Sequence, residues 1–388
     1  MTRADTAPRP LTGVDDPEIT LADVLAHLRG EIGETLIDAD AAAQLARIAQ
    51  AVPAALAPFW GVEIRLADPA PRADILWEVR RESRGSALLA GTAEGEDRLA
   101  SLCARSPVWQ AMRRFAELWG SEGVGAHVGN LWFEADAAAA RTDAELDAAL
   151  TRPCLFWGAR TDRNGSDRAL LAALPTLAHD VFGLSLTSAP LHAAARALPE
   201  GAEIFQIGVM GARAGTLTRL CLRRMEQGEA MQWLKAIGWP GDPAAAFARV
   251  APYLSAAHAF ALNVDLLDGR TGPKLGVELY REPGHIDLAR WRDILAALEA
   301  DGLALPAKTA AILRYPGKER FNQSHEWHRR TGWGYPTLSR SLHHVKVVVT
   351  PDGVQEAKTY LGAYRPSFDY GAVFGAPEKG DRDAWLEP

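Results

Sequence analysis

The feature that most constrains the fold is a hairpin pattern between His343 and Tyr364, in which each strand has one apolar and one polar face. Val345, Val347 and Val349 alternate on one side, and residues 351–353 (Pro-Asp-Gly) supply a turn. Because alternate residues of a strand point to opposite sides, the apolar face predicts contact with a core. The other face predicts contact with water or an anion, since it carries His344, Lys346, Lys358, Tyr360 and Tyr364.

The same one-sided alternation recurs in four earlier pairs of segments. Strands are expected over 61–69 with 73–81, 128–136 with 152–160, within 203–225 and within 258–282. Helices are expected between the pairs, over 20–58, 96–119, 167–198, 226–256 and 286–314, with breaks at Pro175 and Gly183. The order helix-helix-strand-strand therefore repeats five times, which indicates an α+β protein with ten antiparallel strands.

Each predicted strand is polar on one face, so helices are expected to cover only the other face of the sheet. An open sheet of this kind is one solution. Closing the sheet removes both of its edges and turns the polar faces into a lumen. We expect a closed ten-stranded antiparallel barrel with helices outside and a ligand chamber in the lumen, because about ten strands enclose more space than side chains alone fill.

Composition limits the partners and the location of the chain. Its 388 residues carry a net charge of −7, which argues against nucleic acid as a partner. No apolar run of about 18 residues predicts a membrane helix, so no membrane partner is expected. The single cysteines 103, 154 and 221 favour a cytoplasmic location over a disulfide framework. We expect a loose leader over 1–18, one barrel domain over 19–366 and a tail over 367–388.

Basic side chains are frequent on the predicted polar faces although the chain as a whole is acidic. Several cations facing one lumen would suit a diphosphate, because buried charges are costly unless they are paired. The alternative is that these cations pair with Glu63, Glu78, Asp265 and Glu278. The candidates are Arg65, Arg80, Arg160, Arg219, Arg223, Lys274, Lys346 and Lys358.

Two short motifs on these strands resemble those of the ABBA aromatic prenyltransferases, and of their dimethylallyltryptophan synthase branch in particular. Lys358-Thr359-Tyr360 resembles the basic residue followed two positions later by tyrosine that holds the isoprenyl diphosphate in that branch. Val62-Glu63-Ile64 resembles the first-strand glutamate that holds and deprotonates the indole nitrogen. The resemblance covers roughly residues 20–365 and implies the closed barrel with its substrate inside (PT barrel).

The resemblance also implies roles for individual residues. Transfer of an isoprenyl group from an allylic diphosphate, such as dimethylallyl diphosphate, to an indole, a tryptophan or another electron-rich ring would be its activity, with the acceptor free or in a peptide. Glu63 would orient or deprotonate the acceptor. Arg80, Arg219, Lys274 and Lys358 would hold the diphosphate. Tyr280, Tyr360 and Tyr364 would shield the allylic cation through their ring faces.

Some strands depart from the family motif, and this keeps two other hypotheses open. Residues 219–221 (Arg-Leu-Cys) lack the tyrosine, and residues 278–280 (Glu-Leu-Tyr) lack the base. The chain would then be a non-catalytic binding or peptide-maturation accessory protein on the same barrel, or an unrelated α+β enzyme acting on another anionic substrate. The histidines 325, 328, 343 and 344 do not have a zinc-protease spacing, and no aspartate-rich motif is present. No cofactor is therefore expected beyond, at most, loosely bound Mg²⁺.

Overall fold

The computed structural model describes residues 19–93, 97–120, 123–211, 213, 217–268, 270–281, 288–320 and 337–364. The expected leader, the expected tail and residues 325–328 lie outside these ranges. The strands are β1 (Phe59–Arg65), β2 (Ala73–Arg80), β3 (Val128–Ala135), β4 (Cys154–Ala159), β5 (Glu203–Met210), β6 (Leu217–Arg223), β7 (Ala259–Leu267), β8 (Arg270–Tyr280), β9 (Gly317–Arg320), β10 (Thr337–Thr350) and β11 (Gly353–Tyr364).

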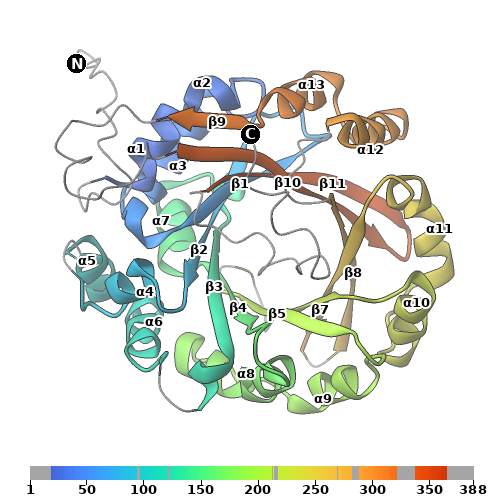
Figure 1. Ribbon diagram of the computed structural model, residues 1–388, viewed down its shortest axis with the longest axis horizontal. Helices are drawn as coiled ribbons and strands as arrows, with labels where there is room; N and C mark the ends of the chain where they lie inside the picture. The colour runs from blue at the N-terminus through green and yellow to red at the C-terminus, as the bar shows by residue number, and fades with distance from the viewer. Residues whose placement is uncertain are drawn as a thin grey trace.

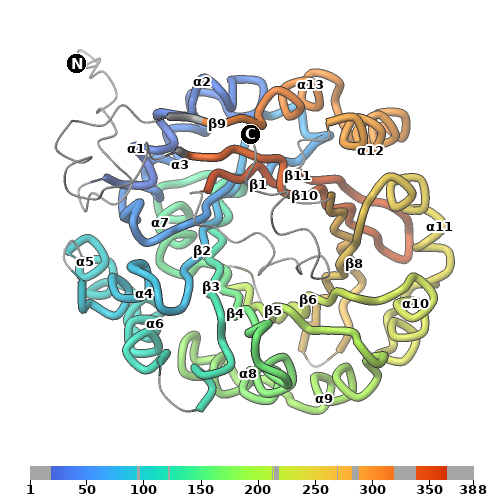
Figure 2. The backbone as a smooth tube through the Cα atoms, in the orientation of Figure 1, coloured from blue at the N-terminus to red at the C-terminus, as the bar shows by residue number. Residues whose placement is uncertain are grey.

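The sheet closes on itself as a ten-stranded antiparallel barrel. Strands β1 to β8 pair in sequence order, β8 pairs with β10, and β11 pairs with both β10 and β1. The predicted hairpin therefore closes the ring, and in Figure 2 the red strands β10 and β11 lie beside the blue β1. Strand β9 pairs with the first residues of β10 and is not one of the ten.

The helices surround the barrel on its outer side (Figure 1). They are α1 (Leu21–His27), α2 (Arg29–Ile32), α3 (Ala39–Ala49), α4 (Arg84–Leu89), α5 (Asp97–Arg105), α6 (Pro107–Glu117), α7 (Asp143–Thr151), α8 (Ser166–Phe182), α9 (Ser188–Arg196), α10 (Gln227–Ala236), α11 (Pro243–Leu254), α12 (Leu288–Ala300) and α13 (Pro306–Arg314), with 3₁₀ turns η1 (Ala54–Leu56), η2 (Val124–His127) and η3 (Ala137–Ala139).

Side-chain caps begin several of the helices at the residues that the sequence suggests. The Thr20 hydroxyl accepts from the backbone N–H of Asp23, and the Asp23 carboxylate accepts from Thr20 in return, a capping box at the start of α1. Asp38 caps α3 in a similar way, by accepting from the Ala41 N–H. None of the helices in the described ranges is long and apolar enough to cross a membrane.

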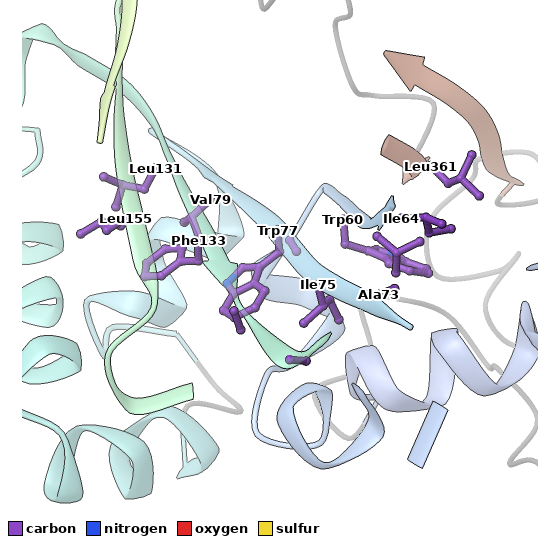
Figure 3. Packing of buried hydrophobic residues seen from close by; sticks show 14 of the residues in the cluster. Trp60, Ile64, Ala73, Ile75, Trp77, Val79, Leu131, Phe133, Leu155 and Leu361 are labelled. Atoms are coloured by element: carbon purple, nitrogen blue, oxygen red, sulfur yellow. The ribbon is translucent and has the colours of Figure 1, made fainter. Parts of the chain in front are cut away.

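The main core lies between the outer face of the barrel and the helices. Trp77 of β2, Phe133 of β3 and Trp109 of α6 stack with ring planes within 13° of one another, and their centroids are 4.9 to 6.3 Å apart. Figure 3 shows Trp77 and Phe133 beside Ile75, Val79 and Leu131 on the same face of β2 and β3. This face holds the apolar half of the alternation, so burial against helices fixes which side chains face the lumen.

Three local predictions need correction. Pro175 lies inside α8 and does not end it, because Leu170, Leu171, Leu174 and Leu177 are buried on both sides of the proline. The segment 314–337 was expected to be a loop, but strand β9 lies within it. Helix α7 between β3 and β4 confirms the short alanine-rich helical insert that was expected there. A bulge between Leu342 and His344 interrupts the alternation, so both His343 and His344 line the lumen.

Candidate ligand chamber

The barrel lumen contains a pocket, called here the cavity, in which a water-sized sphere has about 80 Å³ of free volume. Rings and charged side chains both contribute to the lumen, and the end where β1 begins also holds the ion pairs of Glu78 with Arg80 and of Glu203 with Arg223. Toward the end formed by the start of β1 and the end of β8 lie six rings, called here the aromatic half: Phe59, Trp132, Phe156, Phe205, Tyr280 and Tyr360. Toward the other end lie charged side chains, called here the ionic half: Glu63, Arg65, Asp74, Glu134, Arg219, Asp265, Lys346 and Lys358.

The rings of the aromatic half contact one another closely. Phe59 meets Trp132 edge to face at 5.2 Å between centroids, and Tyr364 stacks on Phe59 at 6.3 Å. His344 stacks on Tyr360 at 4.0 Å and tilts against Tyr280 at 5.1 Å. Faces of this kind attract a cation held near them by roughly 1–2 kcal/mol each when water is excluded.

Glycines leave the space that these rings occupy. A Cβ atom at Gly208 would lie 2.4 Å from a ring carbon of Phe156, and one at Gly362 would lie 2.5 Å from the ring of Phe59. In the ionic half a Cβ at Gly276 would lie 2.6 Å from Cε of Lys346. Because glycine has no side chain, the rings of Phe156 and Phe59 and the side chain of Lys346 can occupy these positions.

The predicted residue Glu63 is buried in a network of its own. Lys358 donates to Oε1 at 2.8 Å, and the Tyr360 hydroxyl donates to Oε2. Arg65 lies 3.8 Å from Oε1 and 3.0 Å from Asp74. Burial would raise the pKa of Glu63, but the charges of Lys358 and Arg65 and these hydrogen bonds outweigh burial and hold its pKa well below the ordinary value.

The other cations of the ionic half are also paired with carboxylates. Arg219 forms a bidentate pair with Asp265 at 2.7 and 3.1 Å. Lys346 donates to Asn263 and lies 3.4 Å from Glu278. Tyr280 donates its hydroxyl proton to Glu278 at 2.6 Å. The expected surplus of positive charge is therefore balanced among the described residues, as the pairing alternative predicts.

Glu134 differs from Glu63 because it lines the cavity and has one weak partner among the described residues. That hydrogen bond comes from Arg213 at 3.4 Å, and Arg213 makes two 3.0 Å bonds to Asp136. Burial, reinforced by the carboxylates of Glu63 and Asp136, raises the pKa of Glu134 to about 7. A group with this pKa exchanges protons near neutral pH.

Some lining side chains carry a buried polar atom for which the described residues supply no hydrogen-bond partner. These atoms are Nε1 of Trp132, Nδ2 of Asn263 and Nε2 of His344. His344 shares a 2.6 Å Nδ1–Nδ1 contact with His343, and burial lowers the pKa of both rings well below the ordinary value. Buried polar groups are usually hydrogen-bonded, so these atoms indicate a place where a ligand binds.

The structure brings together only part of the predicted site. Tyr280, Tyr360 and Arg219 line the cavity, whereas Glu63 and Lys358 are bonded to each other and are not among the residues that line it. Tyr364 is half-buried and stacks on Phe59. Arg80 is paired with Glu78 at 3.1 Å and does not line the cavity.

Lys274 is exposed and lies apart from the other predicted diphosphate ligands. The pairing of β8 with β10 runs from Leu275 to Leu279, so Lys274 extends past the paired part of the wall. Lys346 of β10 is the lysine that lines the cavity.

The sequence reasoning missed Trp132 and Glu134, although the alternation of Asn130, Trp132 and Glu134 on one face of β3 was a visible signal. Nowhere in the described part of the chain do three His, Cys, Asp or Glu side chains gather to hold a metal ion.

Comparison with known proteins supports the fold. No protein-family model and no curated protein matches the sequence. Among solved structures, 6-dimethylallyltryptophan synthase from Micromonospora olivasterospora, in complex with DMASPP and Trp, aligns over 88% of this chain and 97% of its own, with a TM-score of 0.50 and 14% identity.

Two further prenyltransferase structures are less similar. AnaPT from Neosartorya fischeri aligns over 79% of this chain and 77% of its own, with a TM-score of 0.46 and 12% identity. Prenyltransferase PriB, in a ternary complex with L-tryptophan and dimethylallyl thiolodiphosphate, aligns over 89% and 96%, with a TM-score of 0.47 and 12% identity. By its closed strand order and its likeness to the Micromonospora enzyme, the chain has the PT-barrel fold.

Proposed function

We propose that this chain is an aromatic prenyltransferase, which moves an isoprenyl group from an allylic diphosphate to an electron-rich ring, with indole or tryptophan, free or in a peptide, as the acceptor. The observation that carries the proposal is a barrel lumen that aromatic rings line together with charged side chains such as Arg219 and Lys346. In the reaction the C–O bond to diphosphate breaks with its electron pair, a bond to the ring forms, and the ring loses a proton.

The chamber supplies what such a reaction needs. We expect the faces of Tyr280 and Tyr360, which line the cavity, to stabilise an allylic cation, and the rings around them to limit the access of water that would capture it. Of the cations, Arg219 and Lys346 line the cavity and are the groups proposed to hold the diphosphate, with Lys358 on the strand next to Lys346. Phosphate oxygens would replace carboxylate oxygens as their partners.

The test is product formation. The purified chain is incubated with dimethylallyl or geranyl diphosphate and a panel of indoles, tryptophan-containing peptides and phenols, and mass spectrometry measures acceptors that gain one prenyl group. Samples without donor, and a Tyr360→Ala variant, serve as controls. Absence of product with every pair would contradict the proposal. The same assay with EDTA tests the expectation that at most loosely held Mg²⁺ is needed.

One observation favours a second candidate, a non-catalytic binding or peptide-maturation accessory protein. Each lumen-facing cation in the described ranges lies within 4.0 Å of a carboxylate, so a diphosphate would have to displace an existing partner. Calorimetric titration with dimethylallyl diphosphate separates the two. Binding without turnover would support the second candidate, and absence of binding would favour an enzyme that acts on a different anion.

A further inference from the structure

Two buried carboxylates on neighbouring parts of the chamber wall, Glu63 and Glu134, differ in what they can accept. Both oxygens of Glu63 are occupied, Oε1 by the Lys358 ammonium and Oε2 by the Tyr360 hydroxyl. Glu63 is also absent from the cavity lining, which Tyr360 reaches instead. A ligand in the cavity therefore contacts Tyr360, whose hydroxyl occupies one oxygen of Glu63.

Glu134 and Glu278 both line the cavity, but Glu278 accepts from the Tyr280 hydroxyl at 2.6 Å and from Lys346 at 3.4 Å, so Glu134 is the less occupied of the two. It lies on β3 two residues after Trp132, so both side chains point to the lumen, and both line the cavity. Glu134 is 8% exposed and receives one bond, at 3.4 Å, from a guanidinium that binds Asp136 more closely. A buried carboxylate accepts up to four hydrogen bonds, so most of its capacity is unused.

Charged and titratable groups from every neighbouring element act on Glu134. The two guanidinium groups, Arg213 and Arg219, favour its ionised form, whereas the carboxylates of Glu63 and Asp136 oppose it. The Cys154 thiol and the Tyr360 hydroxyl also respond to its charge, and burial raises the pKa of each. Asp74 adds to the same cluster through its coupling to Glu63 and Asp136. A donor from a ligand would supply the stabilisation that this carboxylate lacks.

We propose that Glu134, rather than Glu63, receives the hydrogen bond of the aromatic acceptor, so that the chamber selects rings that carry their own donor, an indole N–H or a phenol O–H. This inference rests on the proposed function for the identity of the acceptor. Trp132 supplies an aromatic contact beside the carboxylate, and Glu134 fixes the rotation of the acceptor ring within the aromatic half. Glu63 instead holds Lys358 and Tyr360 in place.

The test compares ligands that differ by one donor. Calorimetry measures the affinities of indole and 1-methylindole, and of phenol and anisole, for the wild type and for Glu134→Leu, Glu134→Gln and Glu63→Gln. A hydrogen bond to a charged group corresponds to a preference of roughly tenfold to hundredfold for the donor-bearing ligand.

We expect this preference for the donor-bearing ligand in the wild type and in Glu63→Gln. It should disappear in Glu134→Leu and be reduced in Glu134→Gln. A preference seen with one ligand pair only would identify the donor as N–H or as O–H.

A pH series supplies a readout that a merely structural role would not change. The ionised carboxylate is the stronger acceptor, so the wild-type preference should grow between pH 6 and pH 8, and Glu134→Gln should show no such growth.

Thermal melts check that each variant folds, and the Glu134→Gln series decides the question if Glu134→Leu does not fold. Loss of the preference in Glu63→Gln, its survival in both Glu134 variants, or absence of binding by all four ligands would overturn the inference. If Glu134-dependent binding occurs without product, prenyl transfer fails and this inference stands.

Discussion

The aromatic and ionic halves of the lumen are built on the same ten strands, yet the interactions that hold them differ. In the aromatic half, rings such as Phe59 and Trp132 pack edge to face, and glycines make the room for rings such as Phe59. In the ionic half, each cation is tied to a particular carboxylate, as Lys358 is to Glu63. Non-directional packing tolerates a ligand between the rings, whereas a buried ion pair tolerates the loss of a partner poorly.

Glu134 is the member of the ionic half that lies two residues from Trp132 of the aromatic half. It is buried like the other ionic-half carboxylates, but its one hydrogen-bond partner among the described residues is 3.4 Å away. This comparison leads to four predictions about stability and binding.

The largest effect is expected from breaking an ion pair of the ionic half. Lys358→Ala leaves the 2%-exposed Glu63 without its closest cation. Loss of one partner of a buried pair costs roughly 3 kcal/mol, the lower end of the usual range because Arg65 and Tyr360 remain. A thermal melt should show a Tm lower by roughly 4 °C. The double variant Glu63→Gln/Lys358→Ala should recover much of the loss, and an unchanged Tm in the single variant would contradict the pairing.

A smaller effect is expected from crowding the aromatic half. In Gly208→Ala the new Cβ meets the Phe156 ring at 2.4 Å, so the ring must move toward the cavity. Overpacking of this kind costs about 1–3 kcal/mol. Because the displaced ring enters the chamber, aromatic ligands should bind about tenfold more weakly, as measured by calorimetry. Gly241→Ala, at a glycine outside the barrel wall, is the matched control, and equal ligand affinities in the two variants would contradict the effect on the chamber.

Within the ionic half, Glu134→Gln should stabilise the protein in a pH-dependent way. The pKa of Glu134 is raised from 4.5 to about 7, so the folded state holds its proton more tightly than the unfolded state. The free energy of unfolding of the wild type therefore falls as pH rises from 4.5 through about 7. The Glu134→Gln variant has no carboxyl group at this position, so its free energy of unfolding does not fall for this reason. At pH 8 we expect a gain on the order of 1 kcal/mol in denaturant unfolding, and at pH 5 a much smaller one. An equal gain at both pH values would show that burial of the charge is not its cause.

The smallest effect is expected for Lys274, which belongs to neither half. Its side chain is exposed, so Lys274→Ala should change stability by no more than about 0.5 kcal/mol. It should also leave the affinity for dimethylallyl diphosphate unchanged, whereas Arg219→Ala should weaken it if the proposed diphosphate site is right. Titration calorimetry on the two variants makes the comparison. Weaker binding of dimethylallyl diphosphate by Lys274→Ala would show that Lys274 belongs to the diphosphate site after all.

Local sequence pattern predicted much of the fold. The alternation of valines at 345, 347 and 349 with His344 and Lys346 assigned the two faces of β10 correctly, and the same argument placed Tyr280 and Tyr360 in the lumen. It overlooked Glu134 because strand β3 was recognised without its faces being assigned. Pattern could not predict the bulge at His343, since a bulge depends on the register of the partner strand.

The sequence by itself determined which side chains face the lumen, because the period of a strand is a property of its own backbone. Only the tertiary structure decided which of them meet. Glu63 lies opposite Tyr360, and Lys358 reaches Glu63 across 295 residues of chain, because β11 closes the ring against β1. The same closure gives both oxygens of Glu63 a hydrogen-bond partner and leaves Glu134 facing the cavity. The sequence alone shows no such difference, because both glutamates simply lie on a strand. Pairing depends on register and closure, and these are set by the whole barrel.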